Sequence, residues 1–598
     1  MNIGIGRNAL KATTTGNGIV AVGHDAISVG DPDSDTVAFG NGALMNAAAG
    51  SLRNTALGHQ AGSDHTTGDD CVYVGTNAGM QNRTGVSNTY VGSNAGEGVD
   101  NNSNSYNTAV GHKSLHVITT GQFNQAFGYQ SGEDLTTGGH NALYGADAGA
   151  SLTTASQSVF IGSQAGASPL TGNANIGIGY DALNGATTTG DHNIAIGLSA
   201  GDALTSGFAN TLMGKDAGGA LNSGARSVLI GHEAGASITT GYLNVVVGYQ
   251  AADALLTGTS NTIIGARALG AADGAEKNNV VVGTDAMSSV NNEKTEGNIA
   301  LGTDSMVGGT GGLIHNIAIG TNALNSTAGN NVTGSIAIGY NTLTAVTSGD
   351  LNVAIGYIAG DAINTGQQNV ALGFEALSTA TTVTGATALG AGALGDGNVT
   401  SDANYTTAVG LAALKAMTTG VGNVAVGAFT GDSITTGAYN TIVGYQALTS
   451  AGTGVSHNTV VGYRAGYKLG DDGGSDHSEQ NIAIGYLAMA GGHDTVANNT
   501  SNFNVAVGNS ALGGGTGAST SLTGNNNAAF GHNALKVLST GGNNVCIGKD
   551  SGDSITTANF NTLIGNGSDL SAANGENQNV FGYAAIGVGN NSVTLGNT

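Results

Sequence analysis

The segment Asn193-Ile194-Ala195-Ile196-Gly197 returns, with small changes, along the whole chain of 598 residues. Asn352-Val353-Ala354-Ile355-Gly356 and Asn423-Val424-Ala425-Val426-Gly427 are two further copies, and the closing glycine recurs about every seventeen residues, as at Gly248. Val, Ile, Ala and Thr dominate the segment, and a period of this length is too short for a two-helix repeat. The sequence therefore predicts an all-β fold, a parallel β-solenoid or β-roll of about 34 coils.

A second glycine lies seven residues before the repeat glycine, usually after two threonines, as in Thr239-Thr240-Gly241 ahead of Gly248. We interpret it as the turn that leads into the strand, because glycine adopts positive φ without a steric penalty and threonine hydroxyls bond to nearby backbone. A short segment such as Tyr180-Asp181-Ala182-Leu183 follows the repeat glycine and is expected to be a second strand.

No Pro-rich linker and no shift in composition divides the chain, which contains only two prolines. We therefore expect one continuous solenoid shaft over residues 1–598. At the strand spacing of roughly 4.8 Å, its coils would stack into a rod on the order of 160 Å long. Both ends stop within the repeat, so other fibre or virion modules are expected to cover them.

The net charge of −24, with 15 basic against 39 acidic residues, argues against nucleic acid as a partner. No stretch of eighteen apolar residues occurs, and Met1 leads directly into the repeat, so we expect neither a membrane span nor a signal peptide. Cys71 and Cys546 lie too many coils apart to pair within one chain, and both are expected to be small buried residues.

The two strand faces are both apolar. We expect the residues on either side of the middle position, such as Ile194 and Ile196, to point into the coil, and the middle residue, often Ala, to point outward. A strand that is apolar on both faces is normally buried on both, so the outward face should meet another copy, most plausibly in a parallel homotrimer. The alternative is that the middle residue lines a wider core within one chain.

The asparagine that opens the segment recurs in most coils. Stacked in register, its amides are expected to form a hydrogen-bonded ladder along the solenoid. These asparagines are Asn54, Asn88, Asn107, Asn193, Asn244, Asn352, Asn440, Asn504 and Asn544.

The motif Asn-x-[Ala/Val]-Ile-Gly followed by x-x-[Ala/Ser] resembles the head repeats of trimeric autotransporter adhesins, which form a left-handed β-roll and trimerise. The longer coil with its Thr-Thr-Gly turn is still more similar to the shafts of bacteriophage tail fibres, and the similarity covers the whole chain. This resemblance implies a structural protein of a virion tail fibre, or of a cell surface, that attaches to a host glycan or protein receptor. The adhesin repeat is shorter, so the handedness of the coil stays open.

The ending Asn591-Ser592-Val593-Thr594-Leu595-Gly596-Asn597-Thr598 resembles the sequence ahead of the self-cleaving chaperone domain that trimerises many phage fibres. That domain does not follow here. The resemblance implies that the chain is a fragment or a processed product.

Two features are candidate receptor contacts. The residue after the repeat glycine is often Tyr, which predicts an aromatic stripe that either stacks on sugars or covers an edge of the coil. Three repeats within residues 463–530 carry enlarged loops at the same position of the repeat. Solenoid insertions at one position of the repeat project from one face. The candidate contact residues are Tyr445, Tyr463, Tyr467, Tyr486, Asp471, Asp472, His477 and His493.

No motif of a catalytic centre or a cofactor site is present, and we expect neither enzyme activity nor a cofactor. Asp471 and Asp472, together with Asp476 and His477, could hold a divalent ion only weakly, and a solvated acidic loop is the simpler interpretation. The alternatives are a trimeric bacterial surface adhesin, a β-solenoid glycan depolymerase and an ice-binding solenoid. The last is disfavoured because adjacent threonines in a strand point in opposite directions.

Overall fold

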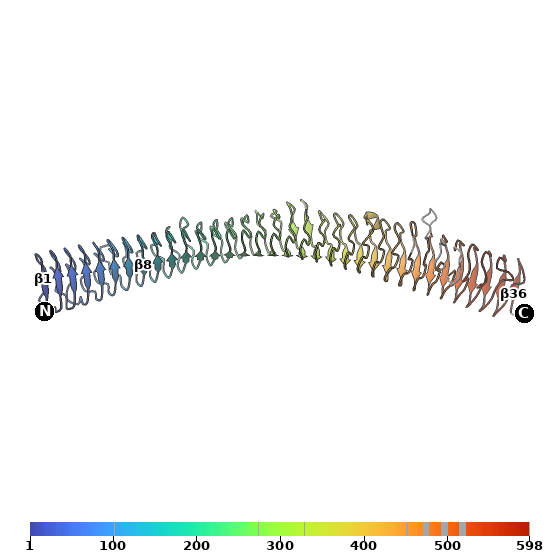
Figure 1. Cartoon of the computed structure of the whole chain (residues 1–598), viewed down its shortest axis with the longest axis horizontal. Helices are drawn as coiled ribbons and strands as arrows, with labels where there is room; N and C mark the ends of the chain where they lie inside the picture. The colour runs from blue at the N-terminus through green and yellow to red at the C-terminus, as the bar shows by residue number, and fades with distance from the viewer. Residues whose placement is uncertain are drawn as a thin grey trace. The chain divides into compact units, whose positions relative to one another are not determined.

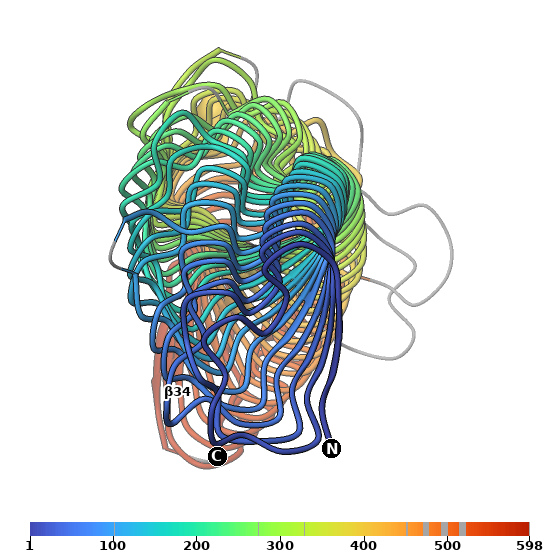
Figure 2. The same cartoon turned by 90° about the vertical axis from the view of Figure 1, so that its left-hand side faces the viewer.

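The computed structural model describes residues 1–100, 102–272, 274–327, 329–449, 452–470, 478–491, 500–513 and 522–596. The fold is all-β, a parallel β-solenoid of about 33 turns with a spacing near seventeen residues, as the sequence predicts. The chain forms two compact units, Met1–Gly297 and Asn298–Thr598. Within each unit the strand arrows stand side by side (Figure 1), and the turns of the first unit overlie one another when seen from its first turns (Figure 2).

In the first unit each turn contributes one strand of three residues, which pairs in parallel with the strand of the next turn. The strands are β1 (Ile3–Ile5), β2 (Val20–Val22), β3 (Val37–Phe39), β4 (Thr55–Leu57), β5 (Val72–Val74), β6 (Thr89–Val91), β7 (Thr108–Val110), β8 (Gln125–Phe127), β9 (Ala142–Tyr144), β10 (Val159–Ile161), β11 (Ile176–Ile178), β12 (Ile194–Ile196), β13 (Thr211–Met213), β14 (Val228–Ile230), β15 (Val245–Val247), β16 (Thr262–Ile264) and β17 (Val280–Val282).

The second unit repeats this pattern and adds a short pair of two-residue strands, β19 (Leu313–Ile314) with β21 (Val332–Thr333), and one 3₁₀ turn, η1 (Ser401–Ala403). Its main strands are β18 (Ile299–Leu301), β20 (Ile317–Ile319), β22 (Ile336–Ile338), β23 (Val353–Ile355), β24 (Val370–Leu372), β25 (Thr387–Leu389), β26 (Thr407–Val409), β27 (Val424–Val426), β28 (Thr441–Val443), β29 (Thr459–Val461), β30 (Ile482–Ile484), β31 (Val505–Val507), β32 (Ala528–Phe530), β33 (Val545–Ile547), β34 (Thr562–Ile564), β35 (Asn579–Phe581) and β36 (Val593–Leu595).

The register between neighbouring strands sets each residue beside its counterpart one repeat later. Ala195 of β12, for example, lies beside Leu212 of β13. Each position of the repeat therefore becomes a column that runs along the stack of turns within a unit. A residue type that recurs at one position of the repeat therefore lines one column of the structure.

The repeat glycine ends each strand because no other residue fits there. Gly356 has a φ of +138°, and a Cβ added to it would lie 2.3 Å from the carbonyl oxygen of Gly373, the repeat glycine of the next turn. Successive turns thus approach backbone to backbone at this column, which only a residue without a side chain allows.

The segment after the repeat glycine is a series of tight turns and not the second strand that the sequence predicts. In Tyr180-Asp181-Ala182-Leu183, Asp181 and Leu183 both have a positive φ, 56° and 54°. Alternating left-handed residues bend the chain too sharply for a strand. The backbone nevertheless bonds to both neighbouring turns, because the Asp181 N–H donates to Ser163 and the Leu183 N–H donates to Ala200.

The predicted orientation of the strand residues is wrong. The middle residues, such as Ala195, Ala354 and Ala425, are fully buried, and the residues on either side of them, such as Ile194 and Ile196, are partly exposed. The middle residue is often small because the turn is thin, and a layer of small or branched residues packs closely against it from the other side. The alternative from the sequence, that this position lines the core of one chain, is the one that the structure shows.

The core balances large and small residues between these two layers. Leu212 takes the middle position of β13 beside Gly201, where an added Cβ would lie 2.6 Å from the Leu212 Cδ1 atom. Conversely, Gly177 takes the middle position of β11, where an added Cβ would lie 2.8 Å from the Phe160 ring of the neighbouring turn. Protein interiors are packed as densely as organic crystals, so a large residue in one layer requires a small residue opposite it.

The asparagine column forms the ladder that the sequence predicts. The side chain of Asn193 is fully buried, and its Nδ2 donates to Asn175 Oδ1 at 3.1 Å and to the Gly207 carbonyl at 2.9 Å. Its Oδ1 accepts from the backbone N–H of Asn210 at 3.1 Å. The amides therefore satisfy the backbone groups where each turn enters its strand. Asn352 bonds likewise to Gly366 and Asn369.

Both cysteines are free and buried, as predicted. Cys546 takes the middle position of β33, and burial raises the pKa of its thiol well above the usual range. Cys71 lies just before β5, where burial also raises the pKa of its thiol. A thiol held in its protonated form is a poor nucleophile, so both side chains act as core residues.

Candidate contact surfaces

The first and third residues of the strands form what we call the outer sheet face. They are mostly Val, Ile, Thr, Leu and Phe, and they are half-exposed; Ile161 and Ile264, for example, each expose 40% of their surface. Two such columns continue over the seventeen strands of the first unit alone. A monomeric protein usually exposes no apolar patch above a few hundred Å², which two columns of this length exceed.

The outer sheet face is also free of charge. In the strands that the structure describes, no first or third residue is Asp, Glu, Lys or Arg. The residue after the repeat glycine is never acidic either, although the chain carries 39 acidic residues. Acidic residues begin one position further on, at Asp147, Asp216 and Glu375, for example. The negative charge is thus kept away from this face.

The residues after the repeat glycine, here called the tyrosine column, lie beside the outer sheet face. Where aromatic residues follow one another in this column, their rings stack. Tyr340 and Tyr357 lie with ring centres 5.3 Å apart and planes 15° apart, and Phe374 continues the stack. Each ring of the stack is about half-exposed. The aromatic stripe predicted from the sequence is therefore a set of short ladders.

Four predicted contact residues come together at one such ladder. Tyr463 lies between Tyr445 and Tyr486, with ring centres 5.7 and 5.2 Å away. The Arg464 guanidinium lies over the rings of Tyr463 and Tyr467, at 5.6 and 5.2 Å. Stacking covers both faces of the Tyr463 ring, so the ladder presents ring edges and hydroxyls, and open aromatic faces only at its ends. This geometry suits hydrogen bonding better than the stacking of sugars, which is one of the two alternatives left open by the sequence.

The remaining predicted contact residues, Asp471, Asp472, His477 and His493, lie outside the described residues. The same is true of most of the added residues in the three enlarged repeats of the 463–530 sub-region. Their role as a receptor contact stays a prediction.

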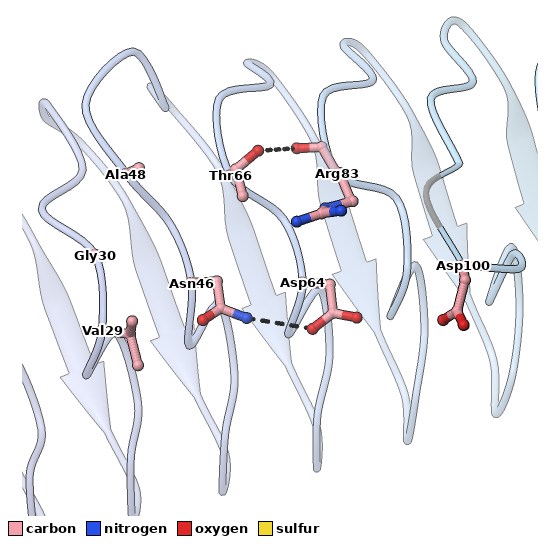
Figure 3. Close-up of a pocket in the computed structure, with 8 residues that line it drawn as sticks. All are labelled: Val29, Gly30, Asn46, Ala48, Asp64, Thr66, Arg83 and Asp100. Carbon is pink, nitrogen blue, oxygen red and sulfur yellow. Dashed lines mark hydrogen bonds between the residues drawn. The ribbon is translucent and has the colours of Figure 1, made fainter.

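A shallow hollow of about 500 Å³ lies on the first unit, away from the predicted sites (Figure 3). Its lining comes from successive turns and is polar at its centre, where Asn46 Nδ2 donates to Asp64 Oδ1 at 3.2 Å and Thr66 donates to the Arg83 carbonyl at 2.8 Å. The full lining is Val29, Gly30, Asn46, Ala48, Asp64, Thr66, Arg83 and Asp100. Its polar groups bond to one another between turns, which indicates a structural role.

Five aspartates, each five residues after the repeat glycine of its own turn, have partly buried carboxyls. Burial raises the pKa of Asp361 from its ordinary value of 3.8 to about 6, and its buried Oδ1 atom has no hydrogen-bond partner among the described residues. Burial raises the carboxyl pKa in the same way at Asp202, Asp253, Asp432 and Asp553.

The raised pKa values of these five carboxyls predict that mild acid stabilises the solenoid. A carboxyl whose pKa is raised in the folded state adds stability below about pH 4 and loses it as the pH rises through about 6. The shift at Asp361 corresponds to about 3 kcal/mol, which water around the half-exposed group reduces to about 1 kcal/mol. Asp361→Asn should raise the free energy of unfolding at pH 8 by that amount. The variant should also lose the part of the increase in stability between pH 8 and pH 5 that protonation of Asp361 contributes. Denaturant titrations at both pH values, with the exposed Asp402→Asn as control, measure this; a stability that falls from pH 8 to 5 contradicts it.

In the part of the chain that the structure describes, no three His, Cys, Asp or Glu side chains gather where they could hold a metal ion. No helix among those residues is long and apolar enough to cross a membrane.

The outer sheet face is the surface that the sequence interpretation misassigned. A signal that could have identified it lies in the middle position, where a large residue such as Leu212 contacts a glycine, Gly201, inside the turn. No protein-family model matches the chain, and no curated protein resembles it closely enough to count as a relative.

Proposed function

We propose that the protein is a structural fibre protein, the shaft of a homotrimeric viral tail fibre that serves attachment to a host cell surface. The observation that carries the proposal is the outer sheet face, which is apolar, uncharged and continuous within each unit of a strongly acidic chain. Such a face is stable in water only when another surface covers it. A solenoid that is covered lengthwise by further copies of itself is a fibre.

Two features support an attachment role over a purely mechanical one. The tyrosine ladder at Tyr445, Tyr463 and Tyr486 displays hydroxyls and ring edges that suit a host glycan or a protein receptor. Several copies of a weak contact on one fibre, and several fibres on one particle, convert low affinity into strong binding. Binding of the purified protein to a panel of bacterial surface glycans tests this part; no binding by a protein of trimeric mass would reduce the proposal to a scaffold.

The outer sheet face also bears on the ice-binding alternative. Threonine is frequent as the first strand residue, as in Thr441 and Thr459, but no described strand has threonine as its third residue. The rows of paired threonines that would order water are therefore absent from the described strands, and the face resembles a protein interface more closely.

The mass of the assembly provides the first test of the proposal. Light scattering of the purified protein should give three times the mass of one chain. A double variant, Ile338→Lys with Ile355→Lys, places two charges on adjacent turns of the outer sheet face. Buried unpaired charges cost several kcal/mol each, so this variant should lower the thermal midpoint by several degrees and open these turns to hydrogen exchange.

The matched control adds the same charges elsewhere on the second unit. Ser348→Lys with Thr365→Lys changes two residues one repeat apart, in the turns before β23 and β24, where both side chains are at least partly exposed. It should behave like the wild type. A monomeric wild type, or equal losses in both double variants, would contradict the proposal.

A further inference from the structure

The two columns of the outer sheet face are not independent. The first strand residue is Val, Ile or Thr in all the main strands described except four, and the third residue of each of these four is aromatic. Only one other main strand, β3, has an aromatic third residue, Phe39 beside Val37. The four pairs are Gln125 with Phe127, Ala142 with Tyr144, Ala528 with Phe530, and Asn579 with Phe581.

Ala, Asn and Gln share one property that separates them from Val, Ile and Thr: their Cβ carries no branch, which leaves room beside the backbone. Each ring thus stands beside an unbranched residue in the other column of its own turn. Within the chain this arrangement is used at β8 and β9, where Tyr144 stacks on Phe127 and its hydroxyl donates to Gln125 Oε1 at 2.7 Å.

The fold of a single chain does not require the match. In β3, Val37 and Phe39 stand side by side and both are exposed. A ring exposed to water also has no reason to stand beside an unbranched neighbour, because overpacking costs free energy only where a surface is covered. The balance therefore reflects what packs on the outer sheet face.

Resting on the fibre assembly proposed above, we infer that the copies pack in parallel and in register, with the first column of one copy against the third column of the next at the same turn. Phe530 of one copy then lies over Ala528 of its neighbour, and β3 is the only main strand described where this packing sets a ring, Phe39, over a branched residue, Val37. A copy shifted by one turn would place the Phe530 ring against Val505 or Val545, which are branched, and leave a gap at Ala528. The partner is a second copy because a second copy repeats with the same spacing and carries the same exceptions at the same turns. The face carries no charge that would repel it.

Cysteine pairs test the register. Ala528→Cys with Phe530→Cys marks one turn, whereas Phe530→Cys combined with Val505→Cys or Val545→Cys marks a shift of one turn in either direction. After mild oxidation, the same-turn pair should give covalent dimers and trimers on non-reducing gels, and the shifted pairs should stay single chains. The wild type is the blank, because Cys71 and Cys546 are buried.

Cross-linking by a shifted pair and not by the same-turn pair would overturn the inference. So would the absence of cross-links in all three variants of a protein that has trimeric mass. A monomeric wild type would instead overturn the proposed function, so the two failures are distinguishable by the mass alone.

A volume exchange tests the packing without cysteines. Ala528→Val should lower the thermal midpoint of the assembly by several degrees, and adding Phe530→Ile, which recreates the common Val and Ile pair, should restore most of it. If the double variant is no more stable than Ala528→Val, the two columns do not share one space and the inference fails.

Discussion

Replacement of Gly356 by alanine should break the solenoid locally and cost about 2–6 kcal/mol. The new Cβ would lie 2.3 Å from the Gly373 carbonyl oxygen, and a φ of +138° belongs to a region nearly reserved for glycine. Strain of this kind costs about 1–3 kcal/mol, and an overpacked contact adds about as much. Since the atom in the way is backbone, no side chain can move to relieve the contact.

The loss should stay near the substitution because each turn of a solenoid contacts only its neighbours. Hydrogen exchange should therefore lose protection in β22, β23 and β24 while distant turns keep theirs. Gly392→Asn is the control: a Cβ there meets no atom within 4 Å, and Asn322 holds the equivalent position with a φ of 56°. If both variants exchange like the wild type, the repeat glycine is not the contact that sets the spacing between turns.

The fold class could be predicted from the sequence because the repeat glycine and the asparagine are required by the backbone. Gly197, Gly248, Gly356 and Gly427 all have a φ between +137° and +149° and all face the next repeat glycine, so the requirement returns in every turn. A requirement that repeats at a fixed spacing is visible in one sequence without any relative to compare.

The orientation of the strand could not be predicted in the same way. Ile194, Ala195 and Ile196 are all apolar, so alternation does not distinguish the inside of the turn from the outside. The prediction placed the larger residues in the core, as in most proteins. In this fold the middle position faces a thin core and is often alanine, and the branched residues on either side of it stand on the outer sheet face, where a partner is needed to bury them. We still predict that another copy covers one face of the strand, but this is the face of the first and third residues and not the face of the middle residue.

The candidate contact residues could also be predicted only in part. The repeat spacing correctly put Tyr445, Tyr463 and Tyr486 in one column, because the column follows from the register. That their rings stack on one another, and that Arg464 joins Tyr467 to them, depends on side-chain conformations that a period does not determine.

Replacement of Asn193 by alanine should cost about 3–5 kcal/mol. The amide satisfies the Gly207 carbonyl and the Asn210 backbone N–H from within a fully buried site. Each buried polar group left without a partner costs about 1–3 kcal/mol, and water cannot enter a column that is closed by turns on both sides. The protection of β12 and β13 against hydrogen exchange should decrease most, and a proteolytic cut should appear near Gly207.

Serine at the same position separates the hydrogen bonds from the loss of volume. Ser227 already holds a place in this column, where its hydroxyl accepts from the backbone N–H of Asn244 at 3.3 Å while the side chain makes no bond to the turn glycine. Asn193→Ser should therefore keep the bond to the next turn, lose the one to Gly207 and cost about half as much as Asn193→Ala. Equal losses in the two variants would mean that the amide fills space and that the ladder contributes nothing to holding the turns together. A graded loss would show that each turn is fastened to the next by its own buried amide, so that the stability of the stack is set turn by turn and not by its ends.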